Sequence, residues 1–190
     1  MVLENEIIYV NTRHSGAVEE FSQAFYNTLN SLHTGGRCTV LLCIGTDRVT
    51  GDALGPIIGY KLSRYAPPGT IIYGTLDEPV HAKNLVKTID TIYANHNNPL
   101  VIAIDASLGR KESIGYLTVG EGRVKPGLGL SRDLPEIGDM FITGIVCNNG
   151  VYAKTNIQNT RLNIVMRMAD IAYYGIMNGL NRLNRQGGLV

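Results

Sequence analysis

The chain has 190 residues, of which 44% are hydrophobic and 17% charged, and its formal net charge is +1. This length and composition are typical of a single globular domain over residues 1–190, which can bury a core without disulfides or a structural metal. A net charge so close to zero argues against proteins that coat nucleic acids or bind membrane surfaces, because both need an excess of basic residues.

Apolar runs alternate with helical patterns along the chain. A 3.6-residue period of apolar side chains predicts a helix, and a short uninterrupted apolar run predicts a strand that is buried on both faces. In chain order we predict a helix over 17–33, a strand over 39–44, a helix over 53–65, a strand over 71–73, a helix through 86–92, strands over 100–104, 114–119 and 140–146, and a helix over about 160–183.

The alternation of strands and helices predicts a parallel sheet, because a helix usually connects one parallel strand to the next. We therefore expect an α/β fold: a three-layer α/β/α sandwich around a mostly parallel, twisted sheet. Residues 121–139 form the longest stretch without a pattern. A loop of that length in a compact domain is usually functional.

Cysteine usage and the N-terminus favour a cytoplasmic protein. The three cysteines, at 38, 43 and 147, are odd in number and lack the spacing of a zinc site, which fits a reducing compartment. Glu4 and Glu6 precede only a short apolar stretch, unlike a secretory signal. No run reaches the 18 apolar residues of a membrane span.

Two acids follow predicted strands at the edge where open α/β sheets bind ligands. Asp52 lies in the turn after strand 39–44, and Asp105 directly follows strand 100–104. If these strands are neighbours, the two carboxyl groups face each other across the sheet edge and share a proton. Asp52 is then favoured as the charged partner, since it lies near a helix N-terminus, and Asp105 as the acid. Such a pair can activate water and protonate a leaving amine.

Each acid also has a structural interpretation. Asp47, Thr50 or Asp52 could be the N-cap of the following helix, whereas an acid that closes an apolar strand, as Asp105 does, has no such routine role. Thr75 to Pro79 resembles a capping box with an early helical proline. In that case Glu78 is structural and His81 lies in the helix's first turn. Glu78 also follows a strand, however, and could line a cleft at the carboxyl ends of the strands.

Other chemistries find little support in the sequence. Cys43 lies inside an apolar strand and Cys147 has no histidine at an informative spacing, which argues against a cysteine protease. The chain also lacks the glycine-rich spacings of nucleotide-binding loops.

Four segments carry a resemblance to a known family: CIGTDRVTGDALGP, YGTLDEPVHAKNL, AIDASLG and GDMFITGIV. Together they resemble the YyaC family of sporulation proteins from endospore-forming bacteria. That family is similar to the spore germination protease and, more remotely, to hydrogenase maturation endopeptidases, which share an α/β sandwich. The germination protease is regarded as an atypical aspartic protease of small acid-soluble spore proteins, and its acids match Asp52 and Asp105.

The sequence also departs from these relatives. The hydrogenase proteases bind nickel with acids at the same two positions and with a histidine downstream of the second acid. All four histidines here, at 14, 33, 81 and 96, precede Asp105, which argues against nickel-directed processing. Thr46 stands where the germination protease tends to carry asparagine.

Our first hypothesis is a sporulation-associated endopeptidase without metal or cofactor. Asp52 and Asp105 would be catalytic, Asp47 and Glu78 would bind substrate, and the resemblance implies a spore protein as substrate and the forespore or spore interior as location. The second hypothesis is a non-catalytic sporulation factor that binds a partner or peptide in the same cleft. The third is a Mg²⁺ or Mn²⁺ site built from these four acids, since hard cations prefer oxygen ligands.

Overall fold

The computed structural model describes residues 7–34, 36–127 and 134–186. Its strands are β1 (Ile8–Asn11), β2 (Thr39–Cys43), β3 (Thr70–Tyr73), β4 (Leu100–Gly109), β5 (Tyr116–Glu121) and β6 (Met140–Asn148). Its helices are α1 (Ala17–Leu32), α2 (Leu54–Ser63), α3 (Leu85–Asn95), α4 (Ala153–Gln158) and α5 (Leu162–Gln186), with 3₁₀ turns η1 (Thr50–Ala53) and η2 (Lys111–Ser113).

The strands form one six-stranded sheet in the order β1-β5-β6-β4-β2-β3. The pairs β3–β2, β2–β4 and β4–β6 are parallel, and β5 runs antiparallel to both of its neighbours. β2 and β4 are direct neighbours in a register that pairs Cys43 with Ile104. The mostly parallel α/β sheet that the sequence predicts is therefore confirmed.

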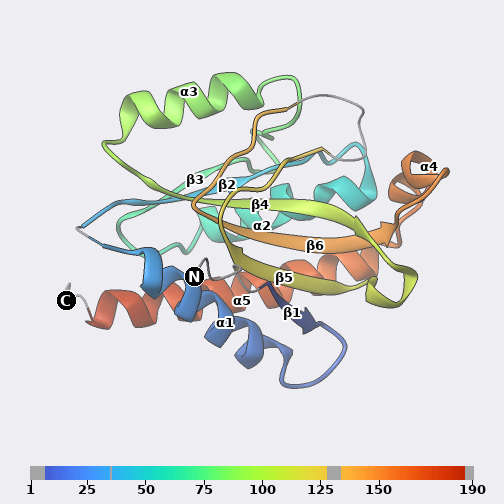
Figure 1. The fold of residues 1–190 in the computed structure, drawn as a ribbon, viewed down its shortest axis with the longest axis horizontal. Helices are drawn as coiled ribbons and strands as arrows, with labels where there is room; N and C mark the ends of the chain where they lie inside the picture. The colour runs from blue at the N-terminus through green and yellow to red at the C-terminus, as the bar shows by residue number, and fades with distance from the viewer. Residues whose placement is uncertain (1–6, 35, 128–133, 187–190) are drawn as a thin grey trace, which may run out of the picture.

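Helices cover both faces of this sheet and complete the three layers (Figure 1). In β2, Leu41 and Cys43 join the larger core beneath α1, α2 and α5. The intervening Val40 and Leu42 join a second core that α3 covers. Every residue of β2 is buried because successive side chains alternate between two covered faces. Among the described residues, no helix combines the length and the apolar character needed to cross a membrane.

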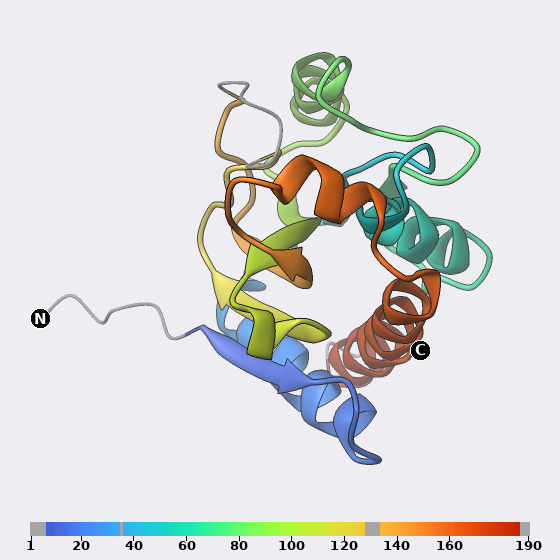
Figure 2. The same ribbon diagram turned by 90° about the vertical axis from the view of Figure 1, so that its right-hand side faces the viewer.

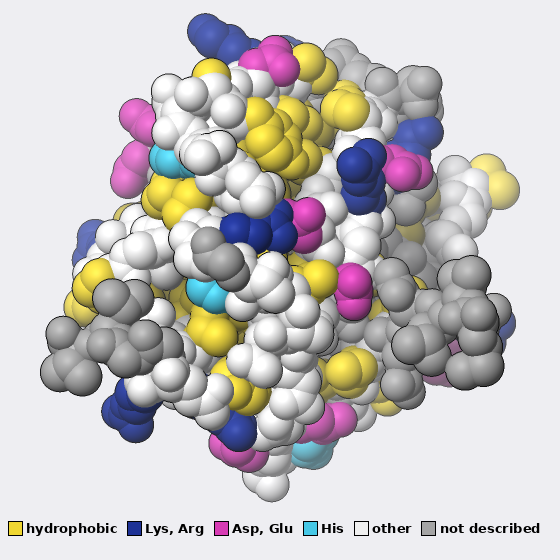
Figure 3. Space-filling model, turned by 60° about the vertical axis from the view of Figure 1, so that its left-hand side comes forward, with side chains coloured by type: hydrophobic (Ala, Val, Ile, Leu, Met, Phe, Trp, Pro, Cys, Tyr) yellow, Lys and Arg dark blue, Asp and Glu magenta, His cyan; other side chains and the backbone are white. Residues whose placement is uncertain are grey.

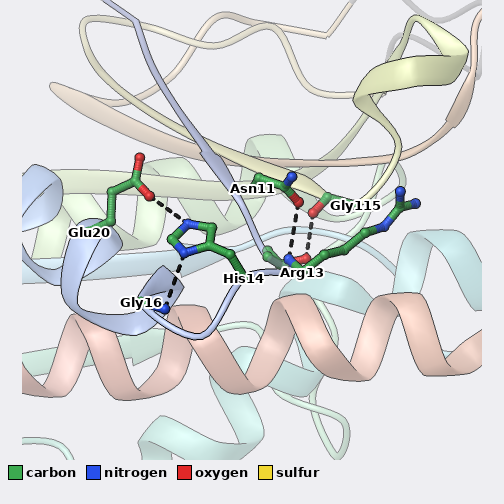
Figure 4. A network of polar contacts seen from close by, with 7 residues as sticks. Asn11, Arg13, His14, Gly16, Glu20 and Gly115 are labelled. Carbon is green, nitrogen blue, oxygen red and sulfur yellow. Dashed lines mark hydrogen bonds and ion pairs between the residues drawn. The ribbon is translucent and has the colours of Figure 1, made fainter.

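The connection from β1 into α1 is held by polar contacts near its two ends (Figure 4). The N–H of Gly16, the N-cap of α1, donates to His14 Nδ1 at 3.1 Å, so the ring's Nε2 donates to the Glu20 carboxylate at 2.7 Å. The backbone N–H of Thr12 donates to the Gly115 carbonyl at 3.3 Å, which ties this turn to the start of β5. The network aligns α1 beneath the antiparallel edge of the sheet.

On the face of the molecule seen in Figure 3, Lys and Arg side chains are interspersed with Asp and Glu. Hydrophobic side chains on the same face gather in separate small groups. This mixture of signs fits the near-zero net charge of the chain.

The structure changes several of the predicted elements. The strand that was expected to close on Asp105 continues to Gly109, because β6 continues beside it as a partner up to Asn148. The helix after β3 begins at Leu85 rather than near Pro79. Strand β1 and helix α4 were not predicted. Residues 128–133 of the predicted loop 121–139 lie outside the described residues, and Val124 and Ile137 beside them form an antiparallel bridge.

Helix α2 packs so closely against the carboxyl end of β2 that no side chain fits between the two backbones. A Cβ added at Gly55 would lie 2.2 Å from the Ile44 carbonyl oxygen, and one added at Gly59 would lie 1.9 Å from the Gly74 carbonyl oxygen. Both glycines lie on one face of the helix, four residues apart. Their missing side chains let the helix approach closely enough to position the η1 turn over the sheet edge.

We expect Gly59→Ala to lower the free energy of unfolding by about 1 to 3 kcal/mol, measured by chemical denaturation, because the added methyl group must displace backbone. Helix propensity alone predicts the opposite sign, since alanine is favoured over glycine in a helix by up to about 1 kcal/mol. Gly16→Ala, at the N-cap of α1, is the comparison, because its Cβ would meet only the His14 ring at 3.5 Å, so any loss of stability there comes from the cap and not from displaced backbone. A Gly59→Ala protein as stable as the wild type would contradict the close-packing argument.

Candidate functional site

Asp52 is held at the sheet edge by a compact turn. The Thr46 N–H donates to the Asp52 carbonyl at 3.0 Å, and the Asp52 N–H donates to the Val49 carbonyl at 2.9 Å. Gly45 has φ of 140° in this turn, and a Cβ there would lie 2.0 Å from the Asp52 carbonyl oxygen. Only glycine fits such a conformation at such a distance. Gly45, two residues after β2, therefore lets the chain turn back so that Asp52 lies over the carboxyl edge of the sheet.

Asp105 lies on β4, one position beyond the last residue that pairs with β2. Its carboxyl group is almost fully buried, with 4% of the residue exposed. The Ala106 N–H donates to Oδ1 at 2.8 Å, and the Gly127 N–H donates to Oδ2 at 3.4 Å. β2 has ended beside Asp105, while β6 still pairs with it through Thr143.

Asp52 and Asp105 line the same cavity, which has a volume of about 240 Å³. Figure 2 looks onto the carboxyl ends of the parallel strands, with α4 in the foreground across them. Helix α4 contacts both η1 and β6 and closes one side of the cavity. The lining residues are Thr46, Val49, Asp52, Asp105, Ala106, Leu108, Gly127, Lys154, Ile157 and Gln158. The pairing of the two acids that the sequence predicts is thus present.

Burial governs the electrostatics of both carboxyl groups. Desolvation raises the pKa of Asp52 to about 6, although the Thr46 backbone N–H opposes this rise. Desolvation and, as the smaller cause, the charge of Asp52 together raise the pKa of Asp105 to about 7, against the opposing effect of the two backbone N–H donors. At neutral pH the pair can hold one proton, with Asp105 as the preferred carrier. This is the division that the sequence suggested, and burial is its main cause.

None of the three cap candidates, Asp47, Thr50 and Asp52, is a helix N-cap. The N-cap residues of η1 and α2 are Val49 and Ala53, and neither helix start has a side-chain capping hydrogen bond. The capping-box interpretation of Thr75 is also wrong as a helix start, since α3 begins only at Leu85. Thr75 Oγ1 instead accepts from the Glu78 N–H at 3.1 Å in a turn. His81 therefore precedes the helix and does not lie in its first turn.

Asp47 and Glu78 lie outside the cavity of the acid pair. Asp47 lines an adjoining depression of about 660 Å³, which shares Thr46 and Asp52 with that cavity. Glu78 lines a third depression of about 510 Å³, which shares Pro79 and His81 with the second. The three hollows adjoin one another along the carboxyl ends of the strands. Asp47 and Glu78 thus lie beside this surface but apart from the buried pair.

The four acids do not converge into a ligand set for a cation. Within the described ranges, no three His, Cys, Asp or Glu side chains come close enough to hold a metal ion together. The hypothesis of a Mg²⁺ or Mn²⁺ site built from all four is therefore wrong. The physical reason is that Glu78 follows β3, which lies beyond β2 from Asp105 in the sheet.

Helix α4, which the sequence did not predict, forms a wall of the cavity with Lys154, Ile157 and Gln158. Six residues make fewer than two turns, too few for a hydrophobic period to be recognised. The role of Gly127 as a donor to Asp105 was also missed, because it joins residues 22 positions apart. Neither feature has a local sequence signal.

Residues 9–175 match the family model described as "Protein of unknown function (DUF1256)". The chain belongs to this family. It is also 44% identical over 168 residues to the uncharacterized protein YyaC of Bacillus subtilis (strain 168), covering 88% of this chain and 81% of that protein. The YyaC family that the sequence motifs indicated is thereby confirmed.

Among solved structures, the chain is similar to the [NiFe] hydrogenase maturation protease HycI from Thermococcus kodakarensis KOD1. The match covers 78% of this chain and 97% of that one, with 15% sequence identity and a TM-score of 0.37.

Burial of Asp105 makes stability depend on pH in a defined direction. Its pKa is higher in the folded than in the unfolded chain, so the folded chain binds more protons between about pH 4 and pH 7. The free energy of unfolding contributed by this group is therefore lost as pH rises through that window. In Asp105→Asn the contribution is absent, so the stability of the variant relative to wild type should rise by roughly 3 to 4 kcal/mol from pH 4 to pH 8.

Urea denaturation of both proteins across this pH range measures the difference. Asp77→Asn, at an exposed position in the turn before Pro79, is the matched control and should follow wild type at every pH. A pH-independent difference between Asp105→Asn and wild type would mean that the carboxyl group is charged in the folded state.

Proposed function

We propose that this protein is an endopeptidase that hydrolyses peptide bonds with the Asp52–Asp105 pair. The observation that carries the proposal is two acids of raised pKa on one cavity at the carboxyl edge of the sheet. Peptide hydrolysis requires one group that takes a proton from water and one that gives a proton to the leaving nitrogen. A buried pair that holds a single proton supplies both at neutral pH.

The environments of the two acids suggest their roles. Asp52, with the lower pKa, accepts a proton from water as the water oxygen bonds to the peptide carbonyl carbon. Asp105, with the higher pKa, is protonated and donates its proton to the nitrogen as the carbon–nitrogen bond breaks. The backbone N–H groups of Ala106 and Gly127 position the Asp105 carboxyl group. No step in this scheme requires a metal.

The adjoining hollows support an extended peptide as the substrate. An extended chain advances about 3.3 Å per residue, so a substrate centred on the acid pair would continue into the depressions of Asp47 and Glu78. These two acids would then bind substrate without taking part in proton transfer. The resemblance of the site motifs to the germination protease supports a spore protein as that substrate, and hence a role in sporulation.

The same surface also favours a second candidate function. The depression beside Asp52 is larger than the cavity itself, at about 660 Å³, and carries both acidic and basic side chains. Such a surface can bind a peptide or partner without any chemistry. In that case the protein is a non-catalytic sporulation factor, and the acid pair is a binding element.

Cleavage of purified spore proteins, followed by intact-mass spectrometry, tests the proposal. We expect discrete fragments from wild type, unaffected by EDTA, and kcat/KM highest between about pH 6 and pH 7, since Asp52 must be charged and Asp105 protonated. Asp52→Asn and Asp105→Asn should each lower kcat/KM by about 100-fold or more, because each removes a proton-transfer group.

Asp90→Asn, on the exposed surface of α3, is the matched control and should retain wild-type activity. Circular dichroism should show that both site variants are folded. Either site variant retaining near-wild-type activity would exclude the carboxyl-pair mechanism. Spore proteins that bind tightly but remain intact would favour the non-catalytic factor.

A further inference from the structure

The cavity of the acid pair is mainly apolar apart from the two carboxyl groups. Ala106 and Leu108 line it from β4, Val49 lies before η1, and Ile157 projects from α4. The longer polar side chains, Lys154 and Gln158, belong to exposed positions of α4. Pockets of this composition bind apolar groups and use their few polar atoms to orient them.

The volume of the cavity sets the size of what can enter. An apolar cavity of roughly 150 Å³ is large enough to admit a benzene molecule. The cavity here, at about 240 Å³, can therefore hold a branched aliphatic or aromatic side chain. A polar side chain placed against the wall of Val49, Ala106, Leu108 and Ile157 would lose its hydration, because these four side chains offer no hydrogen bond.

We infer that this cavity is a specificity pocket for an apolar side chain that flanks the scissile bond, and that Ile157 sets its size. The inference rests on the proposed peptidase function. The two carboxyl groups and the apolar wall share one cavity. When the carbonyl carbon of a peptide substrate lies near the carboxyl groups, a neighbouring side chain of that substrate therefore lies against the wall. The preferred substrates are therefore peptides with Leu, Ile, Val, Met or Phe at one fixed position beside the cut.

The position of Ile157 is set by the turn that carries Asp52. A Cβ at Gly51 would lie 2.6 Å from Ile157 Cγ1 and 2.7 Å from the Ile157 carbonyl oxygen. Helix α4 is thus seated directly against the backbone of η1. The wall of the pocket and the acid next to Gly51 are held by the same contact, so pocket size and acid position are linked.

A library of unstructured peptides, cleaved by wild type and sequenced at the new ends, measures the preference. We expect apolar residues to be enriched about tenfold or more at one flanking position, since one methylene in an apolar pocket changes kcat/KM by about 10-fold to 200-fold. Ile157→Ala should shift the preference toward Phe, and Ile157→Phe toward Ala and Val. Ile164→Ala, a partly buried core position on α5, is the control and should keep the wild-type preference.

A binding measurement tests the pocket without relying on cleavage. N-acetyl-leucinamide and its near-isosteric polar counterpart N-acetyl-asparaginamide are titrated while the methyl NMR signals of Ile157 and Leu108 are followed. We expect saturable shifts with the leucine probe at roughly tenfold lower concentration than with the asparagine probe.

The two experiments separate the inference from the function on which it rests. Cleavage without an apolar preference, or equal binding of the two probes, overturns the specificity pocket. Leucine-selective binding without any cleavage upholds an apolar side-chain pocket and overturns the peptidase. Apolar preference that Ile157→Ala leaves unchanged overturns the assignment to Ile157.

Discussion

The close approach of α2 to the carboxyl end of β2 is the constraint on which the rest of the site depends. Gly55 and Gly59 let the helix lie against the backbone of Ile44 and Gly74. Gly45 returns the chain so that the turn can reach this helix. Any side chain at these points would push η1 outward, and Asp52 with it. These glycines therefore determine where the Asp52 carboxyl group lies.

The second constraint is the burial of that charge beside another. Asp105 lies at 4% exposure next to a second carboxyl group, an arrangement that lowers stability when the pair is ionised. Backbone N–H groups from Ala106 and Gly127 offset part of this cost. A fold with such a large apolar core can tolerate the loss. Among the described residues neither carboxyl group belongs to an ion pair, and buried acids of raised pKa are typical of sites where proton transfer is the task.

Helix α4 links the shape of the site to its chemistry. It is short, has no buried residue of its own, and rests on the η1 turn and on β6. Through Ile157 it closes the cavity in which the two acids meet. Because Ile157 also packs against Gly51, next to Asp52, the shape of the cavity and the position of the acid are linked.

Much of this arrangement is determined by the sequence alone. The uninterrupted apolar runs of β2 and β4 require burial on both faces, and that predicts a parallel sheet with helices on each side. It follows that Asp52 and Asp105 come to the same edge, because ligand sites in such sheets lie beyond the carboxyl ends of the strands. The two acids at that edge could be recognised before the structure was known.

Only the tertiary structure decided how deeply the acids are buried and what surrounds them. β4 continues past Asp105 because β6 is there to pair with it, and the strand β1 exists because β5 offers it an edge. The donor at Gly127 and the wall at Ile157 come from segments far away in the chain. Contacts of this kind have no local periodicity, since they depend on which segments the fold brings together. The pKa values of the pair follow from that packing and from no single stretch of sequence.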